Sequence, residues 1–168
     1  MIIMDVDIEY EFDLEPKTEE DFRITKPIVE WVHDNLENLN VFSKVNYGYN
    51  EDTIKGFGKK PVADVYINNI SYGSDLLDNI PDSVTTFIIC YLKGNMNKTY
   101  LKACELTDYL IQEFEDNLDF RKLTLTTDEG TLNIVRDTYI RNVELQIIPG
   151  NKTYGVLCAF ELEHVLIK

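Results

Sequence analysis

A tight turn near the end of the chain constrains the fold more than any other feature of the sequence. Residues 149–152 (Pro-Gly-Asn-Lys) separate two segments, 143–148 and 154–166, in which apolar residues recur at every second position. A period of two is typical of β-strands, and proline, glycine and asparagine favour the backbone angles of turns. The sequence therefore predicts an antiparallel β-hairpin that closes the chain.

Further strands are predicted upstream of this hairpin. Residues 84–93 (VTTFIICYLK) are apolar on both faces at their centre, which indicates a central, covered strand. Residues 41–49 and 62–72 also alternate, and we interpret them as a strand hairpin with a long tip between them. A further strand is expected at 120–127, followed by a turn at 128–130 and by residues 131–140 as its continuation or its return strand.

Two helices are indicated by apolar residues that recur at steps of three and four. The first is expected to begin at Thr25, the capping residue, and to reach about Leu39, with Pro27 in its first turn, where a missing N–H costs nothing. His33 lies off its apolar stripe and is expected to be solvated. Asn95 or Asn97 is expected to cap a second helix, which reaches about Asn117 and carries a broad apolar stripe.

The order of these elements predicts an α+β fold with a mainly antiparallel sheet, two helices packed on it and a closing hairpin. No repeat or linker interrupts it, so we expect one domain over residues 22–168. Residues 1–21 are expected to form a separate acidic strand or arm.

The acidic arm carries more than half of the net negative charge of the chain. Its nine carboxylates and one lysine contribute −8 of the formal net charge of −14. Two sets of residues alternate within it: apolar Val6, Ile8, Tyr10, Phe12 and Leu14, and acidic Asp5, Asp7, Glu9, Glu11, Asp13 and Glu15. This alternation predicts an extended strand with one acidic face.

Three interpretations of the acidic face stay open. It is a solvated face of an edge strand, in which water and basic neighbours relieve the repulsion between carboxylates. Alternatively, it lines a pore or meets a basic partner surface. A calcium site is the third, and no glycine-containing loop of the EF-hand form follows the segment.

A basic cluster, Lys55, Lys59 and Lys60, lies in the long tip between two predicted strands. Gly56 and Gly58 suggest a phosphate-binding loop, but the residues required before and after them are missing. We therefore interpret the three lysines as a protein interaction site, suited to the acidic surface of a neighbouring copy.

No motif for catalysis or metal binding is found in the sequence. The two histidines, His33 and His164, have no cysteine or carboxylate at ligand spacing, and the hydrolase and dehydrogenase signatures are absent. We expect no metal, no cofactor and no enzymatic activity. The three cysteines, Cys90, Cys104 and Cys158, are expected to be small buried apolar residues.

The acidity of the chain, with a pI near 4.4, argues against binding to nucleic-acid phosphates or to an anionic membrane. Any partner is expected to be cationic or a protein. The N-terminal residues have no basic region followed by a long apolar run, so we expect no secretory signal.

The layout of residues 25–168 resembles the tail terminator (tail-completion) proteins of tailed phages. The resemblance rests on the first helix, the strand pair with a long tip, the Thr-rich strand at Val84-Thr-Thr-Phe-Ile-Ile-Cys-Tyr, the second helix and the closing hairpin Val-Glu-Leu-Gln-Ile … Gly-Val-Leu-Cys-Ala-Phe-Glu-Leu. The acidic arm departs from the short N-terminal start of that family.

The resemblance implies a homo-oligomer, a hexameric ring, that caps the tail tube, stops its polymerisation and docks the head-tail connector. It implies a protein made in the host cytoplasm and located in the virion at the tail–neck junction. On this view some acidic residues face a lumen through which DNA passes without specific binding, and the basic cluster contacts tube, sheath or neighbour. Two alternatives remain: another head-tail joining or neck component, and a small cytosolic α+β enzyme or ligand-binding domain.

Overall fold

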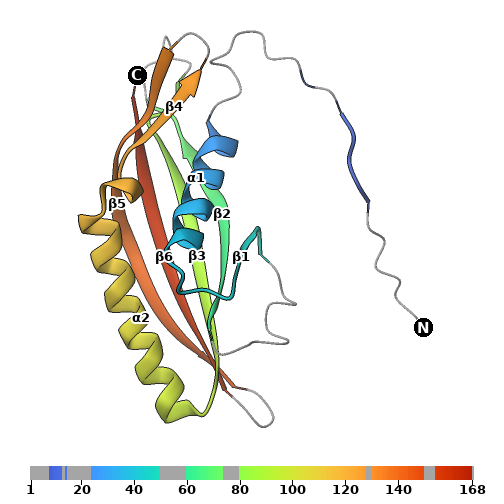
Figure 1. The fold of residues 1–168 in the computed structure, drawn as a ribbon, viewed down its shortest axis with the longest axis vertical. Coiled ribbons are helices and arrows are strands. Elements are labelled where there is room, and N and C mark those ends of the chain that lie inside the picture. Colours follow the sequence, from blue (N-terminus) through green and yellow to red (C-terminus); the bar gives the residue numbers. More distant parts are fainter. Residues whose placement is uncertain are drawn as a thin grey trace.

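In a computed structural model of the chain, the described residues form two helices and a curled sheet of six strands (Figure 1). The structure describes residues 8–12, 14, 24–49, 60–73, 80–127, 130–149 and 154–167. The elements are α1 (Thr25–Asn38), β1 (Lys44–Tyr47), β2 (Val62–Ser71), β3 (Ser83–Gly94), α2 (Met96–Asp116), the 3-10 turn η2 (Leu118–Phe120), β4 (Leu123–Thr127), β5 (Gly130–Ile148) and β6 (Tyr154–Leu166).

The strands are arranged in the order β1-β2-β3-β6-β5-β4, and every neighbouring pair except the first is antiparallel. Strands β5 and β6 form the predicted closing hairpin, with Val143 opposite Phe160. The apolar strand β3 lies in the interior of the sheet, between β2 and β6, as its sequence predicted. The predicted α+β class with a mainly antiparallel sheet is confirmed.

The pairing of β1 with β2 differs from the predicted hairpin. The two strands run parallel, with Lys44 opposite Val62 and Val45 opposite Ala63. A parallel pair needs a connection of about a dozen residues or more, and residues 48–61 are long enough to return the chain to the same end of the sheet. Val45 and Ala63 both enter the same core in this arrangement.

Several predicted boundaries also shift. The segments 131–140 and 143–148 are one continuous strand, β5, with a register irregularity between Ile140 and Asn142. Helix α1 is preceded by Ile24 at the cap position, which makes no side-chain capping bond, so the prediction of Thr25 as the cap is wrong.

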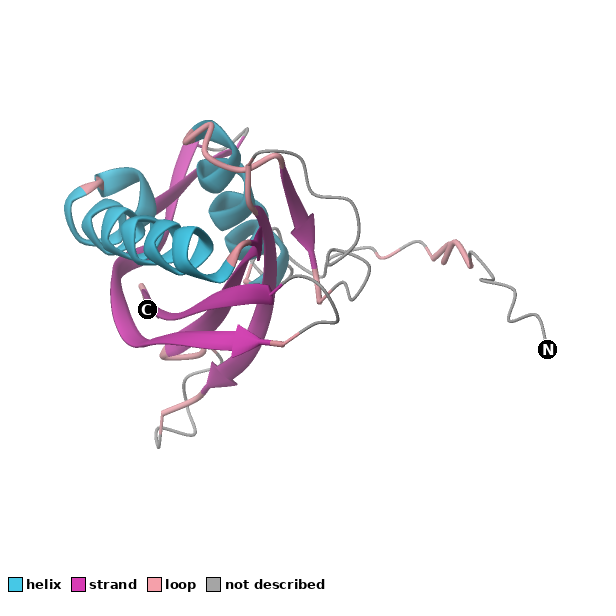
Figure 2. Ribbon diagram, turned by 90° about the horizontal axis from the view of Figure 1, so that it is seen from below, coloured by secondary structure: helices cyan, strands magenta, loops and turns pink. Residues whose placement is uncertain are grey.

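Both helices lie on the same side of the curled sheet (Figure 2). A continuous core joins α1 and α2 to alternate residues of β2, β3 and β6. Its fully buried members include Leu36, Leu110, Phe114, Ile88 and Phe160. The period of the strands and the stripes of the helices therefore build this apolar layer, and a second buried cluster joins α1 to β3, β4, β5 and β6.

The side of β3 that faces away from the helices is less completely covered than the sequence predicted. Phe87 and Ile89 are half-buried, and the Phe87 ring lies 5.6 Å from that of Tyr66 on β2. Side chains of neighbouring strands give these residues their partial cover.

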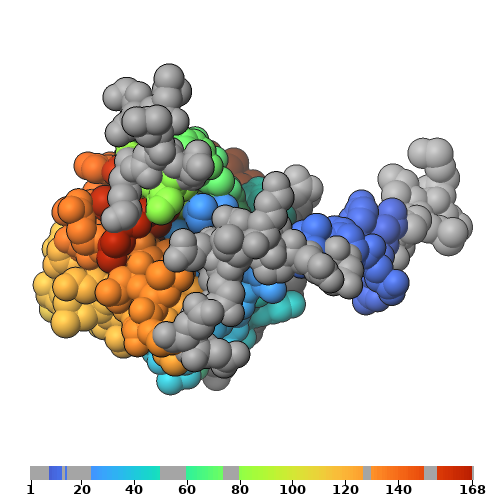
Figure 3. Space-filling view, turned by 90° about the horizontal axis from the view of Figure 1, so that it is seen from above, coloured from blue at the N-terminus to red at the C-terminus, as the bar shows by residue number. Residues whose placement is uncertain are grey.

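The described residues of the acidic arm, 8–12 and 14, form no strand, so the prediction of an extended acidic strand is wrong for them. They are all exposed (Figure 3). A strand is stabilised by hydrogen bonds to a neighbouring strand, and none of the sheet pairings includes this segment. The alternation of the sequence specifies which residues share a face, but it does not supply the pairing strand.

The two histidines are both buried. His33, predicted to be solvated, is 8% exposed, its Nε2 donates to the Val45 carbonyl oxygen at 2.9 Å, and its ring stacks on Tyr47 at 4.1 Å. The prediction is wrong because β1 packs against a side of α1 outside the predicted stripe. His164 is fully buried, and both of its ring nitrogens are hydrogen-bonded.

The cysteines follow their prediction in part. Cys90 and Cys158 are buried between the sheet and the helices, and burial raises the pKa of both thiols. Cys104 on α2 is only half-buried, because it lies at the margin of the helix stripe.

Candidate functional site

The described residues show no arrangement suited to metal binding. Within them, no group of three or more histidine, cysteine or acidic side chains is placed to hold a metal ion. Their buried side-chain nitrogen and oxygen atoms all have hydrogen-bond partners. No described helix has the length and apolar character needed to cross a membrane. The absence of metal, cofactor and catalysis remains a prediction.

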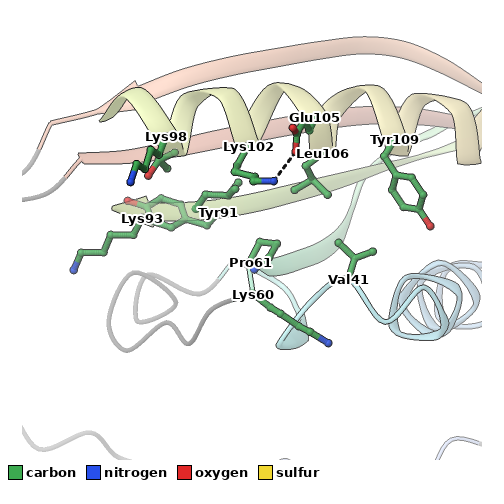
Figure 4. A pocket seen from close by; sticks show the side chains of 12 residues that line it. Val41, Lys60, Pro61, Tyr91, Lys93, Lys98, Lys102, Glu105, Leu106 and Tyr109 are labelled. Atoms are coloured by element: carbon green, nitrogen blue, oxygen red, sulfur yellow. Dashed lines mark hydrogen bonds and ion pairs between the residues drawn. The ribbon is translucent and has the colours of Figure 1, made fainter. Parts of the chain in front are cut away.

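The most distinctive surface feature is a groove of about 450 Å³ between α2 and the segments that flank β1 and β2 (Figure 4). We call it the lysine groove. Four lysines line it: Lys60, Lys93, Lys98 and Lys102. The apolar and aromatic side chains that line it are those of Val41, Pro61, Tyr91, Leu92, Leu106 and Tyr109.

One face of α2 supplies half of the lysine groove. Lys98, Lys102, Leu106 and Tyr109 are spaced by four, four and three residues, which places them on one side of a helix. The Asn95 side chain caps this helix by accepting a hydrogen bond from the Asn97 N–H at 3.2 Å. The cap fixes where α2 begins and hence which residues face the groove.

The junction between β3 and α2 brings the strand lysine next to the helix lysines. Gly94 has a φ of +154°, and a β-carbon there would lie 2.8 Å from the Thr99 hydroxyl. Glycine allows the chain to turn directly from β3 into α2 at this point. Lys93 at the end of the strand and Lys98 in the first turn of the helix then line the same groove.

Charge and apolar surface coexist in the lysine groove. Among the described residues that line it are four of the chain's 16 lysine and arginine residues and one carboxylate, that of Glu105, which pairs with Lys102 at 2.9 Å. The Lys60 ammonium donates to the Asn40 carbonyl oxygen at 3.1 Å. In a chain with a net charge of −14, this is a local excess of positive charge beside an apolar floor. Such a surface suits a partner that is both acidic and apolar.

Two tyrosines, Tyr91 and Tyr109, line the groove. Burial raises the pKa of the phenols of Tyr91 and Tyr109 above 10. Both therefore stay protonated at neutral pH, and the exposed Tyr109 phenol can donate to a carboxylate or carbonyl oxygen of a bound partner.

Of the predicted basic cluster, only Lys60 is described, and it lines the lysine groove. Lys55 and Lys59 lie outside the described residues. Sequence reasoning missed Lys93, Lys98 and Lys102. The spacing of Lys98 and Lys102 on a predicted helix was an available signal, but the position of Lys93 beside them depends on the turn after β3.

Of the predicted acidic face, Glu9 and Glu11 are described and exposed. Asp5, Asp7, Asp13 and Glu15 lie outside the described residues. The apolar residues between these acids are also exposed in the single chain. Ile8, Tyr10, Phe12 and Leu14 are between 60% and 79% exposed. This combination of uncovered apolar and acidic side chains is complementary to the lysine groove.

Neither protein-family models nor curated proteins give a match to this sequence. The assignment of function therefore depends on the residues and surfaces described above and on the resemblance in layout.

Proposed function

We propose that this chain is a non-enzymatic structural protein that assembles into a ring, and that the ring is the tail terminator of a tailed phage. The observation that carries the proposal is the presence, in one chain, of two unlike and complementary surfaces, the acidic arm and the lysine groove. Head-to-tail contacts between unlike surfaces generate rings when the rotation between copies closes. A hexamer is the ring size that the resemblance implies.

The order of elements supports the choice of a tail terminator. The helix, the two strands with a long connection, the buried central strand, the second helix and the closing hairpin occur in the order on which the resemblance rests. The parallel pairing of β1 and β2 replaces the hairpin of that layout. The partners proposed on this basis are the tail tube, the sheath where one exists, and the head-tail connector.

The acidity of the chain also fits a ring through which DNA passes. A negatively charged lumen repels phosphates and so leaves the DNA free to slide. We therefore propose no specific nucleic-acid binding, no membrane binding, and a location at the tail–neck junction of the virion. Another neck component would share these properties and would differ in ring symmetry and in binding partner.

The volume of the lysine groove favours a second candidate function, the binding of an anionic small molecule. About 450 Å³ lies within the range of small-molecule sites, and the groove combines an apolar floor with several cations. A ligand-binding domain of this kind is expected to remain a monomer or dimer.

The first prediction tests assembly directly. Size-exclusion chromatography coupled to light scattering, across a range of protein concentrations, is expected to reveal a ring, either alone or on addition of tail-tube protein. Negative-stain images are expected to show rings or capped tube ends. Tube protein incubated without this chain is the control. A monomer whose mass is indifferent to concentration and to tube protein would contradict the proposal and favour the small-molecule alternative.

A further inference from the structure

We infer that the acidic arm of one copy binds, as an extended segment, in the lysine groove of the next copy. This inference rests on the proposed function, since it specifies the contact from which the ring is built. It names residues 8–12 as the occupant and the lysine groove as the receptor.

The described apolar side chains of the arm are exposed in the single chain. Ile8, Tyr10, Phe12 and Leu14 are large side chains, and each is at least 60% exposed. In an extended segment these four residues, at alternate positions, share one face and form an apolar stripe, and exposed apolar patches mark interaction sites. The part of the chain that the structure describes leaves these side chains exposed, and on this inference a second copy covers them.

The lysine groove and a short extended segment of the arm match in length. The face of α2 from Lys98 to Tyr109 extends for about 16 Å at 1.5 Å per residue. About five residues of extended chain cover the same distance at 3.3 Å per residue. The segment from Ile8 to Phe12 therefore fits along the groove.

The lysines of the groove and the glutamates of the arm are spaced alike. Lys98 and Lys102 are one helical turn apart, which is about 6 Å along the axis. Glu9 and Glu11, on the same face of an extended segment, are about 6.6 Å apart. With the apolar row directed to the floor at Leu106, the acids point outward, and the long lysine side chains reach up from the rim to meet them.

The charge of the lysine groove favours binding of this acidic segment. Elsewhere the chain is acidic, and the arm alone carries a net charge of −8. Like charges across an interface disfavour binding, whereas the surplus of lysines in the groove favours it. The phenol of Tyr109 at one end adds a hydrogen-bond donor for the bound segment.

The test exchanges the charges of the two surfaces in full-length protein. One variant carries Lys98→Glu and Lys102→Glu, a second carries Glu9→Lys and Glu11→Lys, and a third carries all four. Each reversal alone is expected to weaken self-association by at least about tenfold, since it places like charges opposite each other. The fourfold variant is expected to recover association, because the opposite charges again face each other.

The matched control makes the same change of charge away from the groove. Lys26→Glu and Lys122→Glu remove two exposed lysines that do not line it, and association is expected to change by less than twofold. Thermal unfolding checks that each variant keeps the fold. A glutamate at position 98 lies in the first turn of α2, where negative charge is favourable, so no loss of stability is expected from it.

A binding assay separates this inference from the proposed function. A labelled peptide of residues 4–16 is titrated onto the full-length variant with Glu9→Lys and Glu11→Lys, whose groove is intact. It is expected to bind saturably, and Lys98→Glu with Lys102→Glu added to that chain is expected to weaken binding at least about tenfold. A peptide of the same composition, with acids and apolar residues in separate blocks, is the control.

The outcomes are distinct. Peptide binding that is lost on groove reversal, in a chain that forms no ring, supports the contact and contradicts the tail terminator. Rings that persist unchanged when either charge set is reversed support the terminator and overturn this contact. If the control peptide, with acids and apolar residues in separate blocks, binds as tightly as the peptide of residues 4–16, the alternation of acidic and apolar residues does not determine binding, and the proposed contact is overturned. Peptide binding without any change in association among the variants overturns the assignment to a second copy, since the arm then docks within its own chain.

Discussion

Replacing Phe160 with alanine is expected to lower the free energy of unfolding by about 3–5 kcal/mol. Phe160 is fully buried in β6, and its ring lies 5.4 Å from that of Phe114 on α2, in an edge-on arrangement. Phe114 in turn lies 5.0 Å from Phe120, which follows the same helix. Removal of the Phe160 ring leaves a cavity between α2 and the sheet, which the paired strands on both sides of β6 cannot close.

Urea unfolding, followed by circular dichroism, measures this loss. The control is Phe12→Ala, the same chemical change at a side chain that is 72% exposed, for which a change within about 0.5 kcal/mol is expected. If Phe160→Ala does not fold, Phe160→Leu gives a smaller cavity and a measurable transition. A loss below about 1 kcal/mol for Phe160→Ala would show that α2 does not depend on this contact.

The parts of the fold that could be predicted from the sequence are those with local signals. The closing hairpin has turn residues between alternating segments, and α2 has a broad stripe and an asparagine cap. The central strand β3 is marked by an apolar run on both faces. Each of these signals lies within about 20 residues of chain, so no knowledge of distant contacts is required.

The parts that could not be predicted depend on contacts between distant segments. Alternation in β1 and β2 is the same whether the strands run parallel or antiparallel, and only their shared packing against α1 and α2 distinguishes the two. His33 is buried because β1 packs over it, which the stripe of α1 alone does not indicate. The alternation of the acidic arm likewise specifies faces but no neighbour.

The candidate site also combines residues with a local sequence signal and residues that only the fold brings together. Lys60 could be identified as part of a basic cluster in the sequence, whereas Lys93, Lys98 and Lys102 gather only once β3 turns into α2 at Gly94. The charge pattern of the arm was visible in the sequence. The groove that complements it was not, because it is formed by elements far apart along the chain.

Acidification is expected to destabilise the protein through His164, by about 2 kcal/mol between pH 7 and pH 5. The ring is fully buried, with Nδ1 and Nε2 hydrogen-bonded to the Thr138 and Thr86 hydroxyls at 2.8 and 2.9 Å. Burial lowers the pKa of His164 from 6.5 to about 3. Between these values the unfolded chain binds a proton that the folded chain does not. The stability contributed by the neutral ring is therefore complete above pH 6.5 and is lost as the pH falls towards 3.

The carboxylates of the chain also titrate in acid, so the experiment compares wild type with His164→Gln at each pH. Glutamine is uncharged and retains a donor and an acceptor for the two threonine hydroxyls. The variant is expected to be less stable at pH 7, because its shape does not match the imidazole, and to lose less stability than wild type between pH 7 and pH 5. The gap between the two proteins should therefore narrow by about 2 kcal/mol, since the carboxylates contribute equally to both. A difference in unfolding free energy between the two proteins that stays constant with pH would mean that His164 accepts a proton in the folded state. Trp31, whose ring lies 5.3 Å from that of His164, would then report this protonation by a change in its fluorescence.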